Sequence, residues 1–142
     1  MKAQPKTPSP SAICALLQRD DGRYLLIRRA EGLPGGGHWC PVTGRPEPGE
    51  ELRAAVVREV REEVGLEVDV GDEVFSCLTS DHQFRLHWFA CHPTQPSSGH
   101  APLRLQPEEV AEARWLTAKE ASQLTPTFAS TSAFFTQLSD TE

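Results

Sequence analysis

The stretch GRPEPGEELRAAVVREVREEVGL, residues 44–66, carries most of the information in this chain. Its second half has helical character, and Glu62 and Glu63 follow Glu59 by three and four positions, so one helix face carries all three carboxylates. Like charges on one face destabilise a helix, and a bound cation between them would remove that cost. Carboxylate oxygens favour a hard divalent cation such as Mg²⁺, which is coordinated at about 2.0–2.1 Å.

The same stretch predicts a loop, a helix and a second loop. Pro46, Pro48 and Gly49 keep the residues after Gly44 out of a helix. Gly65 is placed to cap the helix at its carboxyl end. Apolar residues recur at steps of one, three and four beside the acidic face: Leu52, Val56, Val57, Val60 and Val64. We therefore expect the valines to face the core and the carboxylates to face a cleft.

These residues resemble the Nudix box, the signature of a family of hydrolases acting on nucleoside diphosphates linked to another group. The signature is Gly, five residues, Glu, seven residues, Arg-Glu, an aliphatic, any residue, Glu-Glu, any residue, Gly and an aliphatic. The chain fills every fixed position: Gly44, Glu50, Arg58, Glu59, Val60, Glu62, Glu63, Gly65 and Leu66. A solvated helix face with alternating charges is the alternative interpretation, and the complete signature favours the functional one.

The resemblance implies a fold and a set of roles. The fold is α+β, a Nudix α/β/α sandwich with a mixed sheet and a loop–helix–loop catalytic box. Arg58 and Glu50 form a structural pair that ties the loop to the helix. Metal ligands are expected at Glu59, Glu62, Glu63, the Thr43 carbonyl and one acid further along, for which Glu109 is the candidate and Glu108 its rival.

The reaction implied is attack of water on a phosphorus atom of a diphosphate, assisted by Mg²⁺ or alternatively Mn²⁺. Glu59 is a candidate general base, but a metal-bound carboxylate is a weak base, so Glu109 is also considered. Arg29 is expected to contact the substrate, against a solvated arginine. Phe128 is expected either to stack on a base or to belong to the core. A nucleoside triphosphate or a nucleotide sugar is the favoured small-molecule substrate.

Two other functions are kept as alternatives. An allylic-diphosphate isomerase shares the fold and uses a cysteine with glutamates, and Cys40 beside Trp39 suggests it. A nucleotide-sensing module would bind without cleaving. Isomerases usually carry a degraded box and sensing modules tend to lose box glutamates, whereas this box is complete.

Whole-chain properties favour one compact domain at residues 11–139, after a flexible leader at residues 1–10. The formal net charge of −6 argues against nucleic-acid polymers and anionic membranes as partners. The number of cysteines, four, allows disulfides, but no secretory segment is recognised in the sequence, so we expect reduced thiols and a cytoplasmic location. The protein is expected to be a monomer or a homodimer.

Alternating and periodic patterns predict the remaining elements. Strands are expected at residues 11–18, 24–29, 67–78, 83–91 and 112–116. Helices are expected at residues 118–124 and 127–138. Residues 31–38, which include three consecutive glycines, are expected to be a loop.

Overall fold

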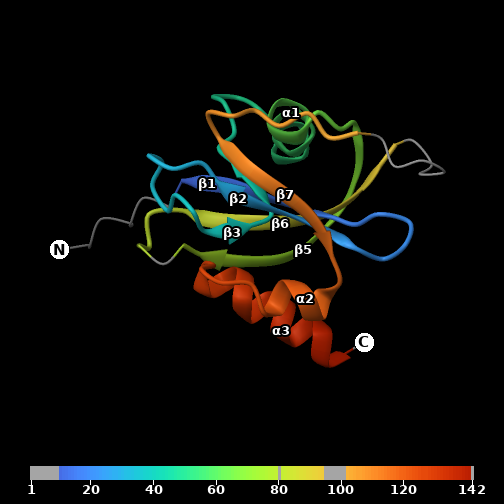
Figure 1. The fold of residues 1–142 in the computed structure, drawn as a ribbon. Coiled ribbons are helices and arrows are strands. Elements are labelled where there is room, and N and C mark those ends of the chain that lie inside the picture. Colours follow the sequence, from blue (N-terminus) through green and yellow to red (C-terminus); the bar gives the residue numbers. More distant parts are fainter. Residues whose placement is uncertain (1–9, 80, 95–101, 142) are drawn as a thin grey trace.

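The computed structural model describes residues 10–79, 81–94 and 102–141. Figure 1 shows a layered fold, with helix α1 (Leu52–Val64) above the strands and helices α2 (Ala118–Ser122) and α3 (Ala129–Thr141) below them. The expected α/β/α sandwich is therefore confirmed. The predicted leader lies outside the described residues except for Pro10, which is exposed.

Within the described residues, seven strands form two sheets in the middle layer. The four-stranded sheet has the order β4-β1-β6-β5, and the three-stranded sheet has the order β3-β2-β7. β1 and β6 are parallel and the other pairs are antiparallel, so the larger sheet is mixed. Their bounds are β1 Ser11–Leu17, β2 Tyr24–Arg29, β3 Trp39–Cys40, β4 Val42–Gly44, β5 Val68–Leu78, β6 Arg85–Pro93 and β7 Val110–Leu116.

The helices are α1 Leu52–Val64, α2 Ala118–Ser122 and α3 Ala129–Thr141. α1 ends at Gly65, whose φ of 75° is the left-handed conformation that glycine adopts without a Cβ clash. The Gly65 N–H donates to the Arg61 carbonyl and closes the last turn. None of the helices in the described ranges is long and apolar enough to cross a membrane.

Two apolar cores follow from the alternation of side chains along the strands. In β1, Ile13 and Ala15 pack in the core beneath α1, together with Val56 and Val60. Their neighbour Cys14 packs in the second core, on the side of α2 and α3. Helices thus cover both faces of the strand layer, and α1 packs on one of these two faces.

The two short strands β3 and β4 were not predicted. β3 pairs with β2 and β4 pairs with β1, both antiparallel. Strands of two and three residues carry too little alternation to show in a sequence. β4 matters for the site, because it ends at Gly44 beside α1.

Candidate active site

A cavity of about 750 Å³ runs from α1 across the strands to the beginning of α3. Seven predicted site residues lie on its wall: Arg29, Thr43, Glu59, Glu62, Glu63, Glu109 and Phe128. Residues from both sheets, from α1 and from the segments just before β7 and α3 therefore meet around one space, although Arg29 and Phe128, the outermost of the seven, lie 99 positions apart in the sequence.

The three helix carboxylates differ strongly in exposure. Glu63 is 4% exposed, whereas the Glu62 side chain is 49% exposed. Burial raises the pKa of the Glu63 carboxyl well above its ordinary value, and a hydrogen bond with Glu59 and the charges of Glu59 and Glu109 raise it further. Three carboxyl groups thus interact closely where the cavity meets α1.

Glu59 lies directly against the backbone of Gly44. A Cβ built on Gly44 would fall 2.3 Å from the Glu59 Cδ atom, well inside van der Waals contact. Any larger residue at position 44 would therefore displace the Glu59 carboxylate. This close approach gives the first glycine of the signature a physical role, and it places Glu59 beside the end of β4.

Arg58 joins the loop to the helix, as expected. Its Nε and Nη2 atoms each donate to a different oxygen of Glu50 at 2.9 Å, and Nη2 also donates to the Arg45 carbonyl at 3.0 Å. Its Nη1 donates to Glu59 Oε1 at 2.9 Å and to Glu62 Oε2 at 3.2 Å. Neither Arg58 nor Glu50 is part of the cavity wall. Their contribution is to hold the loop and two of the wall carboxylates.

The donor set fits a hard divalent cation by its chemistry. Its side chains offer carboxylate oxygens, and a cation beside the buried Glu63 would offset the repulsion among Glu59, Glu63 and Glu109. Arg58 donates to one carboxylate oxygen of Glu59 and to one of Glu62. The other oxygen of each carboxylate is left for other partners. Within the described ranges, no three acidic, histidine or cysteine side chains already surround one point closely enough to hold a metal ion.

Glu109 and Glu108 are separated by the structure. Glu109 lines the cavity, whereas Glu108 is exposed and is not part of the wall. The Glu109 carbonyl accepts a hydrogen bond from the Ala30 N–H at 2.9 Å, which fixes it beside the end of β2. Of these two acids, Glu109 is therefore the one that lines the same cavity as the helix carboxylates.

Arg29 and Phe128 both line the cavity, and both contact the loop at residues 31–38, which contains the three consecutive glycines. The Arg29 Nε donates to the Pro34 carbonyl at 2.9 Å, and its charge acts on Glu63. The Phe128 ring stacks on His38 with centroids 5.0 Å apart and packs against the core beneath α1. Phe128 thus has both of the positions considered for it, in the core and on the cavity wall.

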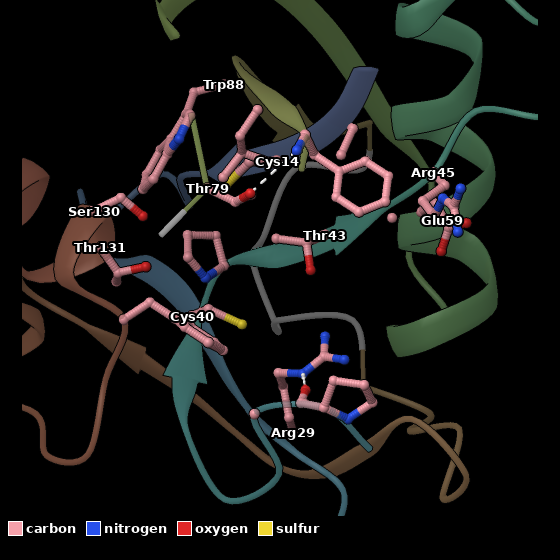
Figure 2. A pocket seen from close by; sticks show the side chains of 18 of the residues that line it. Cys14, Arg29, Cys40, Thr43, Arg45, Glu59, Thr79, Trp88, Ser130 and Thr131 are labelled. Atoms are coloured by element: carbon pink, nitrogen blue, oxygen red, sulfur yellow. Dashed lines mark hydrogen bonds between the residues drawn. The ribbon is translucent and has the colours of Figure 1, made fainter. Parts of the chain in front are cut away.

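Several wall residues were missed by sequence reasoning. Arg45, which follows Gly44, lies over the Phe84 ring at 4.7 Å, and both residues line the cavity. Trp88, Ser130 and Thr131 line it from β6 and the first turn of α3 (Figure 2). Alternation places Leu86 and Trp88 on one face of a strand, but only the tertiary fold shows that this face borders the cavity.

Comparison with known proteins agrees with this geometry. Residues 8–138 match the NUDIX domain. The chain belongs to the Nudix family, and the predicted membership is confirmed.

Two curated relatives show how far the similarity extends. Over 64 residues the chain is 42% identical to the CTP pyrophosphohydrolase of Escherichia coli, covering 45% of this chain and 47% of that protein. Over 125 residues it is 34% identical to the NAD-capped RNA hydrolase NudC of Deinococcus radiodurans, covering 82% of this chain and 40% of that protein. The matched stretches span less than half the length of both relatives.

The fold is also shared with solved structures. The crystal structure of the MutT protein from Methanosarcina mazei Go1 superimposes with a TM-score of 0.76 over 96% of this chain and 98% of that one. The two sequences are 23% identical, so this likeness concerns the fold. It confirms the α+β Nudix architecture.

Proposed function

We propose that this chain is a divalent-metal-dependent hydrolase that cleaves the diphosphate linkage of a nucleoside diphosphate derivative. The observation that carries the proposal is the group of carboxylates, Glu59, Glu62, Glu63 and Glu109, on the wall of one cavity of about 750 Å³. Acidic side chains alone would repel a diphosphate, so a cation must stand between them and the substrate.

Each residue has a role that its position supports. Glu59, Glu62, Glu63, Glu109 and the Thr43 carbonyl would hold Mg²⁺ or Mn²⁺. Such a cation neutralises phosphate oxygens and lowers the pKa of the attacking water. Arg29 would bind a phosphate oxygen through its positively charged guanidinium group. Arg58 and Glu50 keep the helix carboxylates in position through their hydrogen bonds.

The proton of the attacking water needs an acceptor. Glu59 and Glu109 remain the two candidates, because both line the cavity and both interact with the buried Glu63. Because a metal-bound carboxylate is a weak base, Glu109 accepts the proton only where it is not itself a ligand of the cation, and the same holds for Glu59.

The substrate favoured is a nucleoside triphosphate or a nucleotide sugar. A cavity of this volume accommodates a ligand the size of a nucleotide. The similarity to a CTP pyrophosphohydrolase supports the triphosphate, since that protein's name states its substrate.

The test is an incubation of the purified chain with nucleoside triphosphates, dinucleotides, nucleotide sugars and isopentenyl diphosphate. The reaction is run with Mg²⁺, with Mn²⁺ and with a chelator, in water enriched in oxygen-18. We expect metal-dependent cleavage in which the product that contains the attacked phosphorus carries the heavy oxygen. From a triphosphate this product is the nucleoside monophosphate after attack at the α-phosphorus and pyrophosphate after attack at the β-phosphorus; from a nucleotide sugar it is the nucleoside monophosphate or the sugar phosphate. Chromatography of the products then identifies the substrate and the bond that is broken.

The alternatives predict other results in the same assay. Conversion of isopentenyl diphosphate to its isomer, without hydrolysis, would identify an isomerase; Cys40, which is buried and lines the cavity, would then be examined first. Nucleotide binding without turnover would identify a sensing module. Either result would contradict the hydrolase proposal.

A further inference from the structure

Among the described residues, the cavity wall carries two side chains with a permanent positive charge, Arg29 and Arg45. Figure 2 shows them at different places, with Arg29 at the bottom of the view and Arg45 at the right, on the side of Glu59. Arg29 already has an acceptor, because its Nε donates to the Pro34 carbonyl at 2.9 Å. Arg45 is exposed, so a ligand in the cavity can reach it. Its guanidinium has no hydrogen-bond acceptor and no carboxylate partner in the part of the chain that the structure describes.

Arg45 is unusual among the arginines that lie over aromatic rings. Four arginines do so within the described ranges. The other three each donate from Nε to a carboxylate or to a backbone carbonyl, and they are Arg19, Arg53 and Arg114. Arg45 is the one of the four that lines the cavity, and its donors remain for a ligand.

The guanidinium of Arg45 is held in position by its neighbours. Its Cζ atom lies 4.7 Å from the centre of the Phe84 ring. Stacking of this kind uses the face of the planar group and leaves the N–H donors, which point outward in its plane, available for hydrogen bonds. The Arg45 carbonyl accepts a hydrogen bond from Arg58 Nη2 at 3.0 Å, which ties the main chain to α1. The fold therefore orients these donors before any ligand binds.

The surroundings of Arg45 favour an anion that also contacts a bound cation. The preceding residue, Gly44, lies against Glu59, one of the carboxylates proposed to hold the metal ion. A guanidinium repels a divalent cation nearby unless a negatively charged group lies between them. Phosphate suits both, because its oxygens coordinate Mg²⁺ and also accept paired N–H···O bonds from arginine.

We propose that Arg45 binds the terminal phosphate of a nucleoside triphosphate and makes the site select triphosphates over nucleotide sugars. This inference rests on the proposed hydrolase function and decides between its two favoured substrates. With the diphosphate held by the cation and Arg29, the group beyond it meets Arg45. A terminal phosphate is the most negative group of a triphosphate, because it has an additional ionisable oxygen. Its hydrogen bonds with a guanidinium are stronger than those of a neutral sugar hydroxyl.

Other groups fit this part of the wall less well. A nucleobase could stack on this face of the Phe84 ring only by displacing the Arg45 guanidinium that covers it. A cationic substituent would be repelled by Arg45. An apolar substituent would remove water from the Arg45 donors and offer no acceptor in its place, which weakens binding.

The test compares substrates that share a base and differ in the group beyond the diphosphate. UTP with UDP-glucose and GTP with GDP-mannose are two such pairs, and kcat/KM is measured with Mg²⁺ for each nucleotide. Where a nucleotide is not hydrolysed, isothermal titration with Mg²⁺ gives its Kd instead. Arg45→Met keeps a long unbranched side chain without the charge. We expect it to lower kcat/KM for the triphosphates about 10- to 100-fold and to leave the nucleotide sugars unchanged.

Two further variants separate the guanidinium from general effects of the substitution. Arg53→Met is the matched control, because Arg53 also lies over a phenylalanine, 5.7 Å from the centre of the Phe89 ring, but is not part of the cavity wall. It should leave both members of each pair unchanged. Arg45→Lys keeps the charge without the planar fork and should retain part of the preference for triphosphates, even if Arg45→Met folds poorly. Circular dichroism checks the folding of each variant.

The outcomes distinguish this inference from the function on which it rests. In Arg45→Met, an equal loss for triphosphate and nucleotide sugar would assign Arg45 to an inner phosphate, and no loss would remove it from the site. Either result would overturn the inference while the hydrolase proposal stands, as would a wild type that hydrolyses nucleotide sugars in preference to triphosphates. Triphosphate binding that depends on Arg45, without hydrolysis, would contradict the hydrolase proposal alone. Neither binding nor hydrolysis of any of these nucleotides would contradict both.

Discussion

At the scale of single residues, the contact between Gly44 and Glu59 offers the sharpest test of the site. Gly44→Ala places a Cβ where the Glu59 side chain now lies, so the carboxylate has to move by an ångström or more. A displacement of that size costs about 10²-fold in rate. We expect kcat/KM with Mg²⁺ to fall by about that factor, while circular dichroism shows a folded protein.

Gly71→Ala is the matched control for this substitution. A Cβ at Gly71 would lie 3.4 Å from its nearest tertiary neighbour, the Ala90 carbonyl oxygen, which is an ordinary contact. It should retain the wild-type rate. Full activity of Gly44→Ala would mean that the position of Glu59 does not matter for the reaction.

The neighbouring pair Glu108 and Glu109 allows an equally direct comparison. Glu109→Gln removes a carboxylate from the cavity wall and should lower the metal-dependent rate about 10²-fold, the lower end for losing a general acid or base. Glu108→Gln changes an exposed carboxylate outside the wall and should have no effect. Steady-state kinetics at several metal concentrations measure both, and a reversed order would exchange their roles.

At the scale of elements, the pairing of Arg58 with Glu50 links the loop before α1 to the helix. The hydrogen bond from Arg58, with a backbone N–H at Glu47, lowers the pKa of the Glu50 carboxyl from 4.5 to about 2. A carboxyl group whose folded-state pKa is depressed stabilises the fold above its unfolded pKa. That stability is lost as the pH falls through the folded value.

The thermal stability of Glu50→Gln should therefore depend on pH in a defined way. Above about pH 5.5 the wild type should have the higher Tm by a constant margin of a few degrees. This margin should shrink below about pH 4.5 and be nearly absent near pH 2. Thermal melts of both proteins across that range provide the measurement, and a margin that grows on acidification would contradict the pairing.

Elements with a strong local signal were predictable from the sequence. α1 begins after Pro48 and Gly49 and ends at Gly65, and its apolar stripe places Val56, Val60 and Val64 in the core. The pairing of Glu50 with Arg58 followed from the resemblance. The strands at residues 11–17 and 24–29 followed from alternation and the intervening turn.

Features that depend on tertiary contacts were not predictable in this way. β3 and β4 exist because they pair with β2 and β1. Trp88 reaches the cavity because β6 lies parallel to β1, with Trp88 opposite Cys14 across 74 residues of sequence. No local pattern carries that register, so the place of Trp88 on the cavity wall could be found only in the structure.

At the scale of the whole molecule, the net charge of −6 and the clustered carboxylates predict that a divalent cation stabilises the fold. A ligand at 100 times its Kd adds about 2.7 kcal/mol to the free energy of unfolding. We expect Mg²⁺ or Mn²⁺ to raise the Tm of the wild type by several degrees. The rise should be much smaller for the double variant Glu59→Gln, Glu62→Gln at equal ionic strength, and an equal rise would locate the cation elsewhere.

The most direct test of the whole account is the rate of metal-dependent hydrolysis by the wild type and by Glu62→Gln. Glu62 lines the cavity with its side chain 49% exposed, so the amide should be accommodated without loss of the fold. We expect kcat/KM of Glu62→Gln to fall by about 10²–10³, the scale for losing a key electrostatic stabiliser, with an unchanged circular dichroism spectrum. A wild-type rate in Glu62→Gln would contradict the assignment of the α1 carboxylates as the metal site.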